Sequence, residues 1–270
     1  MAMDETSGLG LPQAPKTNVV IVGAGGHGRV VLDILQQDRG IRVAGFIDSN
    51  KDLIGRRVDG VEVLGGMKDL PQLKGERDIT GAIVAIGTNG IRRAFAEELE
   101  QMRITLINAI HPSAHIAANA GLGKNIVIAA GAQICAHCQI GDSVILNTGC
   151  IVDHESMIGT AAHICPGARL AGRVTVEAGA FVGIGATVIH CMRIGYEAIV
   201  GAGAVVIHDV EPLATVVGVP ARVVRDLASC EDFAEWLMPE FLREGKRHRQ
   251  PPPPAKPRQT PAPVEDLKGR

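Results

Sequence analysis

Aromatic residues are scarce in this chain of 270 residues, where one Trp, one Tyr and five Phe make up 3% of the composition. A surface that stacks nucleic-acid bases needs exposed rings, so this scarcity argues against a base-stacking nucleic-acid binder. An excess of one charge is also missing, because 27 Lys and Arg face 29 Asp and Glu for a net charge of −2. This balance argues against bulk charge driving the chain to nucleic acid or an anionic membrane, and we expect no nucleic-acid partner.

Long apolar runs and a cysteine framework are missing as well. No stretch approaches the roughly 20 apolar residues of a membrane span, and the polar leader 1–16, which we expect to be disordered, lacks the apolar core of a secretory signal. The six cysteines are scattered through a chain far above mini-protein size, which favours reduced thiols. We therefore expect a cytoplasmic protein without a membrane span or metal, with Cys135 and Cys138 as small wall residues.

A strict six-residue repeat occupies the middle of the chain. From Ile116 to Val206, every sixth residue is Ile, Leu or Val, without exception in sixteen positions. A helix repeats every 3.6 residues and a strand every 2, so neither produces this period. A triangular parallel β-helix does, because each unit is one short strand and a turn, and three units close a coil around an aliphatic axis. The repeat predicts five coils that stack at ~4.8 Å into a prism roughly 24 Å long, too narrow for aromatic rings.

Two more columns of the repeat agree with this fold. The fourth residue after each axial aliphatic is often a small one, which lets the corner close. The residue directly after the aliphatic is often Gly, which we expect to take the strained dihedral angles of the turn. The small residues include Ala120, Ala132, Ala162, Ala168, Ala180, Ala186 and Ala204, and the glycines include Gly123, Gly141, Gly159, Gly183, Gly195 and Gly201.

The flanking regions have other patterns. Apolar strands that alternate with amphipathic helices predict a small parallel α/β sheet over residues 17–111, followed by the β-helix over 112–224. We predict a helical segment at residues 225–244. Residues 245–270 are predicted to form a disordered, Pro-rich basic tail whose role is open. The predicted α/β strands are 18–22, 43–47, 82–86 and 105–110, and the helices are 30–37 and 91–102.

A glycine-rich loop follows the first strand. Its sequence, Gly-Ala-Gly-Gly-His-Gly at 23–28, matches the dinucleotide fingerprint, and Asp48 ends the next strand 20 residues later. A helix N-terminus and a carboxylate suit the diphosphate and sugar hydroxyls of NAD or of a nucleotide sugar equally. Because the second half of a dinucleotide domain is missing, we favour a nucleotide sugar and expect no NAD. The candidate contacts are Gly25, Gly26, His27, Asp48, Ser49, Gly87, Asn89 and Arg92.

Several of these candidates also have a purely structural interpretation. His27 could make a local hydrogen bond, and Asn89 with Arg92 could be a helix cap and a surface charge. The binding hypothesis rests on the carboxyl edge of the sheet, where ligands bind in parallel α/β domains and where Gly87 ends the third strand.

One polar cluster departs from the β-helix pattern. His154 lies between Asp153 and Glu155, and a flanking carboxylate can orient an imidazole as a general base. Asn147 precedes this cluster, and His163 follows His154 by nine residues, half of an 18-residue coil. The two histidines therefore lie on different sides of one prism, so a site that uses both would be shared between two chains.

These motifs resemble the bacterial nucleotide-sugar acetyltransferases of the left-handed β-helix superfamily. The family includes bacillosamine-pathway and perosamine N-acetyltransferases and related sialic acid O-acetyltransferases. The resemblance covers about residues 18–224 and rests on the glycine-rich half-domain together with 145–148, 152–155, 163 and 171–172. It implies a left-handed β-helix and a homotrimer, with acetyl-CoA between prisms and a nucleotide-linked amino sugar on the N-terminal domain.

The resemblance also assigns roles within the polar cluster. It makes His154 the general base, with Asn147, Asp153 and Glu155 around it. Asp153 stands where a Glu is familiar, which leaves open the carboxylate that supports His154. The acetyl-CoA contacts that it implies are His163, Gly172, Ile184 and Ala202.

The expected reaction is direct N-acetylation of the sugar amine by acetyl-CoA, without a metal. Sialic acid O-acetylation and a non-catalytic nucleotide-sugar or NAD-binding scaffold are the alternatives, and the nucleotide and sugar stay open.

Overall fold

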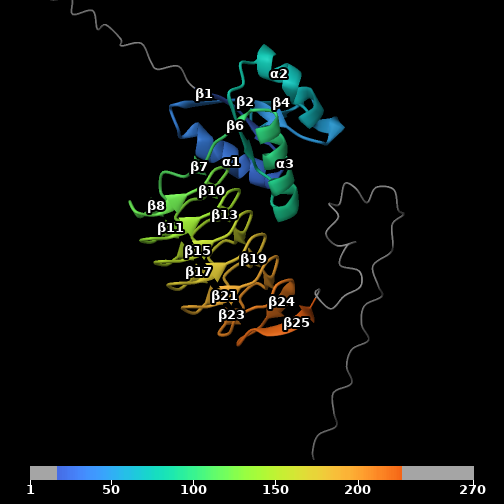
Figure 1. Ribbon diagram of the computed structural model, residues 1–270. Coiled ribbons are helices and arrows are strands. Elements are labelled where there is room, and N and C mark those ends of the chain that lie inside the picture. The colour runs from blue at the N-terminus through green and yellow to red at the C-terminus, as the bar shows by residue number, and fades with distance from the viewer. Residues whose placement is uncertain (1–16, 227–270) are drawn as a thin grey trace, which may run out of the picture. The chain divides into compact units, whose positions relative to one another are not determined.

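A computed structural model describes residues 17–226 (Figure 1). The predicted leader at 1–16, the predicted helical segment beyond residue 226 and the predicted tail at 245–270 lie outside these residues. Within the described part of the chain, no helix has the length and apolar character needed to cross a bilayer.

Residues 17–106 form an α/β domain around one six-stranded sheet. Its strands run in the order β3-β4-β2-β1-β5-β6, and all neighbours are parallel except β3 and β4. The apolar run of β1 is buried on both faces: Val19 and Ile21 pack with α1, whereas Val20 and Val22 pack with α2 and α3. The elements are β1 (Thr17–Val22), α1 (Gly26–Gln36), β2 (Ile41–Ile47), η1 (Lys51–Leu53), β3 (Arg57–Val58), β4 (Val61–Gly65), η2 (Met67–Asp69), α2 (Leu70–Glu76), β5 (Gly81–Val84), α3 (Asn89–Gln101) and β6 (Thr105–Leu106).

The end of this domain differs from the sequence prediction. The strand expected at 105–110 is two strands: β6 pairs with β5, while β7 (Ala109–Ile110) already pairs with β10 of the β-helix. Asn108 fixes the change of partner, because its side chain accepts a hydrogen bond from the Ile126 N–H and donates one to the Gly123 carbonyl. The β3–β4 hairpin and α2 lie between the predicted strands 43–47 and 82–86, where the sequence analysis placed no helix or strand.

The repeat region forms a parallel β-helix with three faces, named here face 1, face 2 and face 3 in the order in which the chain meets them. Equivalent strands lie 18 residues apart, one coil. Face 1 holds β7, β10 (Val127–Ile128), β13 (Ile145–Leu146), β16 (His163–Ile164), β19 (Phe181–Val182), β22 (Ile199–Val200), β24 (Ala214–Val217) and the antiparallel β25 (Arg222–Asp226). Face 2 holds β8 (His115–Ile116), β11 (Gln133–Ile134), β14 (Ile151–Val152), β17 (Arg169–Leu170), β20 (Thr187–Val188) and β23 (Val205–Val206). Face 3 holds β9 (Gly121–Leu122), β12 (Gln139–Ile140), β15 (Met157–Ile158), β18 (Thr175–Val176) and β21 (Arg193–Ile194).

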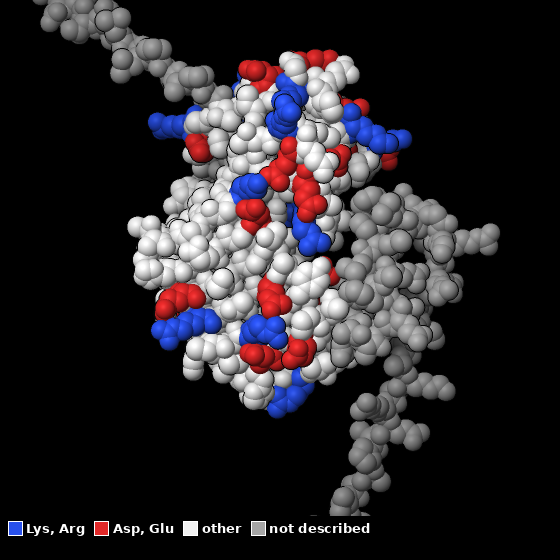
Figure 2. Space-filling model, in the orientation of Figure 1, with Lys and Arg blue, Asp and Glu red and all other residues white. Residues whose placement is uncertain are grey.

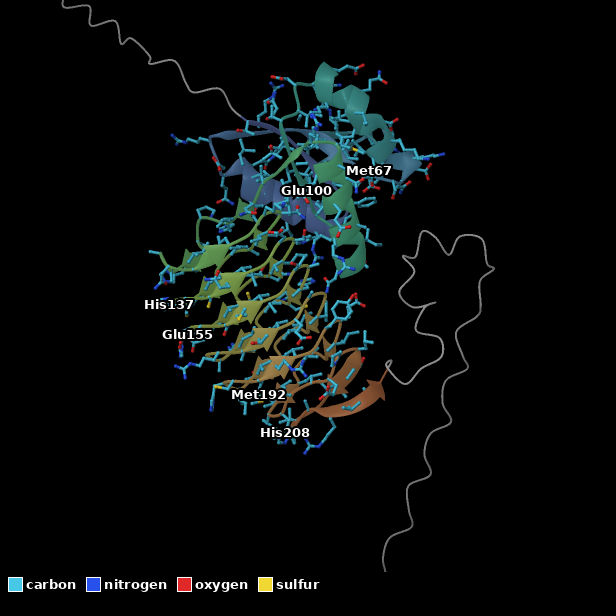
Figure 3. The ribbon with its side chains drawn as sticks, in the orientation of Figure 1. Met67, Glu100, His137, Glu155, Met192 and His208 are labelled. Carbon is cyan, nitrogen blue, oxygen red and sulfur yellow. The ribbon has the colours of Figure 1, made fainter. Side chains whose placement is uncertain are left out.

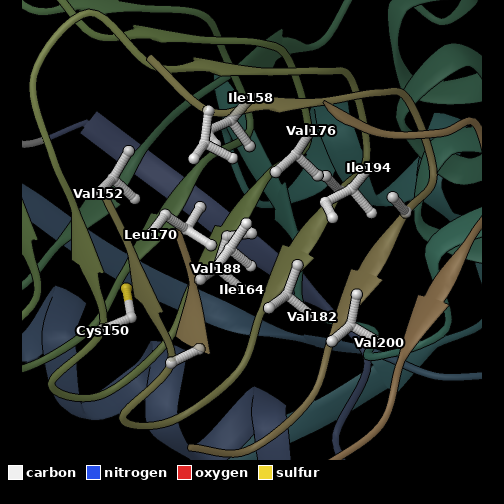
Figure 4. Close-up of a cluster of buried hydrophobic side chains, with 14 of the residues drawn as sticks. Cys150, Val152, Ile158, Ile164, Leu170, Val176, Val182, Val188, Ile194 and Val200 are labelled. Atoms are coloured by element: carbon white, nitrogen blue, oxygen red, sulfur yellow. The ribbon is translucent and has the colours of Figure 1, made fainter. Parts of the chain in front are cut away.

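The sixteen aliphatic positions form the axis of the β-helix, as the period of six predicted. Fourteen are buried, and Ile116 and Leu122 of the first coil are partly buried against the same core. Figure 4 shows the part of this axis from Val152 to Val200. Cys138 and Cys150 occupy the small-residue column of this core. Ile, Leu, Val, Ala and Cys make up its buried residues, so the narrow axis accounts for the scarcity of aromatics.

The prediction for the glycines of the repeat was wrong. Gly159 and its equivalents do not have positive φ; instead, they lie against the next coil, and a Cβ on Gly159 would stand 2.6 Å from the Ala178 nitrogen. The left-handed residue comes two positions later, as Ala161 (φ 58°) shows after Gly159. Close approach between coils, rather than turn strain, therefore selects these glycines.

Face 1 joins the β-helix to the α/β domain. Ala109, Val127 and Ile145 point outward from successive coils and share one buried cluster with the apolar side of α1. The next outward positions on this face are His163 and Phe181. His163 therefore comes directly after three buried apolar residues in the column of outward-facing side chains on face 1.

Candidate active site

A cleft of about 660 Å³ opens at the carboxyl edge of the α/β sheet. A cleft of this size suits a ligand as large as a nucleotide. The turns after β1, β2, β4 and β5 supply its walls, as expected for a parallel sheet. Six of the eight predicted sugar-nucleotide contacts line it: Gly25, Gly26, His27, Asp48, Ser49 and Gly87.

Asp48 shapes the glycine-rich side of the cleft. One carboxylate oxygen accepts a hydrogen bond from the Ala24 N–H at 2.7 Å, and the other accepts one from the Asn50 N–H at 2.8 Å. The N-cap of α1 is Gly25, which provides no side-chain cap, and the first turn of α1 has no acidic residue. The positive end of the α1 dipole is therefore free to face an anion.

The sequence analysis missed several side chains that line the cleft. Two lysines, Lys51 and Lys68, come from the short 3-10 helices η1 and η2, and Phe95 comes from α3. Both 3-10 helices directly follow strands that end at the cleft, so the carboxyl-edge rule applied to β4 would have pointed to Lys68. The other lining residues that were missed are Gly23, Ile47, Ile54, Gly66, Met67, Asp69, Ala85 and Ile86.

Asn89 and Arg92 do not line the cleft, unlike the other predicted contacts. Arg92 is 0% exposed, and burial lowers its pKa to about 9, so it stays charged at neutral pH. Its guanidinium donates to backbone carbonyls on both sides of the joint between the α/β domain and the β-helix. The surface charge that the sequence suggested as an alternative is thereby wrong.

His163 lies on face 1, near the cleft residues Gly87 and His27. The Asn147 side-chain nitrogen donates to His163 Nε2 at 3.2 Å, and the Asn147 oxygen accepts from the Thr148 N–H, which fixes the amide orientation. The proton of neutral His163 therefore sits on Nδ1, which has no hydrogen-bond partner among the described residues. The ring edge packs against Phe181 with centroids 5.2 Å apart. Asn147 is thus a neighbour of His163.

Both histidines near the cleft are held neutral. Burial and, to a smaller extent, the Arg92 charge lower the pKa of His163 to about 3 and that of His27 to about 4. Within residues 17–226, His27 Nε2 also has no hydrogen-bond partner. The joint therefore presents uncharged ring nitrogens at neutral pH.

His154 lies at the corner between faces 2 and 3, after β14. Its Nδ1 is 3.0 Å from a Glu155 carboxylate oxygen, and Arg173 Nε donates to that same oxygen at 3.0 Å. These two contacts lower the pKa of Glu155, so the carboxylate is ionised. It therefore accepts a hydrogen bond from the Nδ1–H of His154. Nε2 of neutral His154 is then left with a lone pair, as a general base requires. Figure 3 shows Glu155 on this edge of the β-helix, between His137 and Met192.

The backbone explains why Glu155, rather than Asp153, reaches the imidazole. Glu155 takes the left-handed corner position (φ 58°), which is periodic along this edge. Asp153 instead accepts a hydrogen bond from the His154 N–H at 2.7 Å. The question that the sequence left open, which carboxylate supports the ring, is answered by this corner.

The four predicted acetyl-CoA contacts lie on separate parts of the β-helix. Gly172 lies one coil after His154, at the same corner between faces 2 and 3. Ile184, 61% exposed, and Ala202 lie one coil apart at the corner between faces 1 and 2, and His163 lies on face 1. His154 and His163 therefore belong to different parts of one chain, as the half-coil spacing predicted.

The cysteines of the repeat do not form a ligand cluster. Among residues 17–226, no group of three or more His, Cys, Asp or Glu side chains is placed to hold a metal ion. Burial raises the pKa of Cys150 and of Cys165 to about 12, which keeps both as thiols. On the face seen in Figure 2, acidic and basic side chains alternate, and neither sign forms a broad patch.

Comparison with known proteins separates two levels of similarity. A family model for the PglD N-terminal domain matches residues 18–99. Among curated proteins, the chain is 37% identical over 114 residues to UDP-N-acetylbacillosamine N-acetyltransferase of Bacillus subtilis, covering 42% of this chain and 51% of that protein. It is also 32% identical over 91 residues to the redox-sensing transcriptional repressor Rex of Lactobacillus acidophilus, covering 33% and 43%. The chain spans about half the length of these curated relatives.

Solved structures match over nearly their whole length. A histidine-to-asparagine mutant of perosamine N-acetyltransferase from Caulobacter crescentus, in complex with CoA and GDP-perosamine, is 41% identical, with a TM-score of 0.74 over 77% of this chain and 97% of that one. The acetyltransferase domain of PglB from Neisseria gonorrhoeae, in complex with acetyl coenzyme A, is 32% identical, with a TM-score of 0.71 over 77% and 100%.

The fold and these similarities define a hexapeptide-repeat acyltransferase with a left-handed β-helix. The α/β domain that precedes the β-helix carries the match to the PglD N-terminal domain. The chain belongs to the nucleotide-sugar N-acetyltransferase family of bacillosamine-pathway and perosamine enzymes.

Proposed function

We propose that this protein transfers the acetyl group of acetyl-CoA directly to the amino group of a nucleotide-linked sugar, with His154 as general base. The observation that carries the proposal is the geometry of His154. An ionised Glu155 accepts a hydrogen bond from Nδ1–H of the imidazole, so that Nε2 keeps its lone pair for a proton from the substrate. The cleft at the α/β domain, with two lysines and a free helix N-terminus, suits the diphosphate of the acceptor. The 41% identity to a perosamine N-acetyltransferase that binds CoA and GDP-perosamine supports both halves.

The reaction needs only one proton shuttle. The neutral sugar amine attacks the thioester carbonyl carbon, and His154 Nε2 accepts the proton that the nitrogen loses. The carbon–sulfur bond then breaks, and the CoA thiolate leaves and takes the proton back from the imidazolium. N-acetylated sugar and free CoA are the products, and the histidine returns to its starting state. A backbone N–H of the β-helix would stabilise the oxyanion.

The site is complete only in an oligomer, and we propose the homotrimer that the family resemblance implied. Gly172 and His154 lie at one corner, while Ile184, Ala202 and His163 lie at another corner and on face 1. Acetyl-CoA can touch both groups when it lies between two chains that present different edges to it. We also propose a cytoplasmic location, on the basis of the cysteine usage.

Thiol release measures the proposed reaction directly. Purified protein is mixed with acetyl-CoA and a panel of UDP-, GDP- and CMP-linked sugars, each as an amine and as the matching alcohol, and free CoA is titrated. Release with the amines alone supports N-acetylation, whereas release with alcohols or sialic acid supports O-acetylation. If no acceptor releases CoA and calorimetry shows binding of NAD or of a nucleotide sugar, the scaffold alternative replaces the enzyme.

A further inference from the structure

Arg92 is the largest fully buried side chain of the described residues. Burying a charge is costly unless its donors are satisfied, and within residues 17–226 no carboxylate pairs with this guanidinium. Its partners are oxygens of the backbone and of one amide. Nε donates to Ser143 O at 2.7 Å, Nη1 to Ile86 O at 2.8 Å and Gly87 O at 3.1 Å, and Nη2 to Asn89 Oδ1 and Ala161 O, both at 2.8 Å.

These partners belong to two different parts of the molecule. Ile86 and Gly87 are the wall of the cleft that follows β5. Ser143 and Ala161 are left-handed corner residues of successive coils, between faces 3 and 1. Asn89, which Arg92 orients, continues the series by donating to Gly179 O of the next coil at 2.8 Å. The guanidinium therefore fastens one wall of the cleft to two consecutive coils directly and to a third through Asn89.

We infer that Arg92 is a positioning residue, which fixes the cleft wall at Ile86 and Gly87 on the β-helix and so sets where the acceptor lies relative to the transfer site. The inference rests on the proposed function, because it takes the cleft as the acceptor site. Gly87 in this wall lies beside His163 of the β-helix. A displacement of the wall would therefore move the bound acceptor relative to the β-helix.

The shape of arginine explains why this position needs it. The planar fork offers five N–H donors in three directions, and here it spans the loop and two corners at once. A lysine keeps the charge but gathers its three donors on one atom, so it cannot reach both sides. A methionine has a comparable length and apolar stem but lacks the donors.

A second hydrogen bond between the α/β domain and the β-helix supplies a matched control. Asn125 is fully buried, and its side-chain oxygen accepts from the Val84 N–H at 2.8 Å, which ties β5 to the β-helix without touching Ile86 or Gly87. Its side-chain nitrogen donates to the Ser143 hydroxyl at 2.9 Å, whereas Arg92 bonds the Ser143 carbonyl. Asn125 has a φ of 57°, so Asn125→Gly removes this tie without backbone strain. It loosens the joint but leaves the cleft wall in place.

The test compares Arg92→Lys, Arg92→Met and Asn125→Gly after circular dichroism has shown which variants are folded. We expect the Arg92 variants to raise the KM for the nucleotide amino sugar at least ~10-fold and to lower kcat, because the acceptor is misplaced. Their KM for acetyl-CoA should stay within about 2-fold of the wild type. Asn125→Gly should lose thermal stability and keep both KM values. A purely structural loss would lower the active fraction and change neither KM.

Amide hydrogen exchange at residues 85–89 gives a readout that needs no activity. We expect faster exchange there in Arg92→Lys than in the wild type and in Asn125→Gly. Wild-type exchange at 85–89 in folded Arg92→Lys would overturn the inference, as would an equal rise of the acceptor KM in Asn125→Gly. Should the wild type release no CoA with any acceptor, the proposed function fails, and the exchange comparison still decides whether Arg92 holds the wall.

Discussion

The imidazole of His154 lies directly against Gly172 of the next coil. A Cβ placed on Gly172 would stand 2.5 Å from Nε2 and 2.6 Å from Cε1 of that ring, closer than carbon atoms can approach. Glycine at 172 therefore leaves the space that the His154 imidazole occupies. Glu155 holds the other side of the ring through Nδ1, and the two contacts together set the orientation of Nε2.

We expect Gly172→Ala to lower kcat by about 10-fold to 100-fold, because the added methyl pushes the imidazole away from its position. The tail of a side chain yields more easily than backbone, so the fold and the melting temperature should change little. Steady-state transfer kinetics and thermal melts measure the two effects. Gly90→Ala is the control, since nothing lies within 4 Å of a Cβ at that helical position. Wild-type kcat in Gly172→Ala would contradict the role of this contact.

His154→Asn should remove the proposed general base and lower kcat at least ~10²-fold while the β-helix stays folded, because His154 is exposed and is not an axial residue. The same substitution at His137, one coil earlier on the same edge, is the matched control. His137 has a positive φ, which Asn tolerates. Transfer activity and circular dichroism should be compared at equal protein concentration. Near-wild-type turnover in His154→Asn would assign the base to another group.

The two carboxylates beside His154 should differ in effect. Glu155→Gln removes the charge that accepts the Nδ1 proton, and we expect kcat to fall about 10-fold, less than on loss of the imidazole itself. Asp153→Asn keeps an oxygen that can accept from the His154 N–H, so its effect should be smaller. The kcat ratio of the two variants is the measurement. A larger loss in Asp153→Asn would transfer the supporting role to Asp153.

The sequence could predict those features of the site that depend on residues close together in the chain or on a regular repeat. The axis followed from sixteen aliphatics, since the period of six is itself the geometry of the coil. The carboxyl-edge rule placed Asp48 and Gly87 at the cleft, because parallel strands end at one edge. Arg92 was predicted beside the ligand by the same rule, because it follows the third strand at that edge. Only the tertiary structure brings the corner carbonyls of Ser143 and Ala161, distant in the chain, around it.

The choice between Asp153 and Glu155 could not be predicted for a different reason. Both flank His154, so spacing alone treats them alike. The left-handed corner decides, and it recurs every 18 residues on this edge at His137, Glu155, Arg173 and Cys191, residue types that do not mark it as a glycine would. A positive φ carried by ordinary residues is invisible in the sequence.

Acid should destabilise the protein through the histidines at the joint. The pKa values of His163 (about 3) and His27 (about 4) lie below the 6.5 of a free histidine. Below about pH 6.5 the unfolded chain therefore binds protons that the folded protein does not, and stability falls as the pH falls toward 4. Each histidine contributes a slope of at most about 1.4 kcal/mol per pH unit.

Urea unfolding at pH 7, 6, 5 and 4 and at one protein concentration measures this slope. We expect His163→Gln to have a smaller slope than the wild type, whereas the control His115→Gln, an exposed position on face 2, should keep it. Carboxylates contribute equally to the compared proteins, so the difference isolates the substituted residue. Equal slopes in wild type and His163→Gln would show that His163 is not held neutral in the folded protein.

Subunit mixing tests whether each site uses two chains. His154 lies at the corner between faces 2 and 3 and His163 on face 1, so the proposed trimer brings them together only across an interface. We expect His154→Ala and His163→Ala to be nearly inactive alone and a co-refolded 1:1 mixture to regain about one quarter of wild-type activity. This follows because half of the chains offer an intact His154 and half an intact His163, and about a quarter of the interfaces join them. The double mutant mixed with itself is the control, since it can form no intact pair. Light scattering establishes the trimer and mass spectrometry its mixed composition. Mixed trimers that stay inactive would place both histidines of a site in one chain, and a monomeric wild type would exclude the shared site altogether.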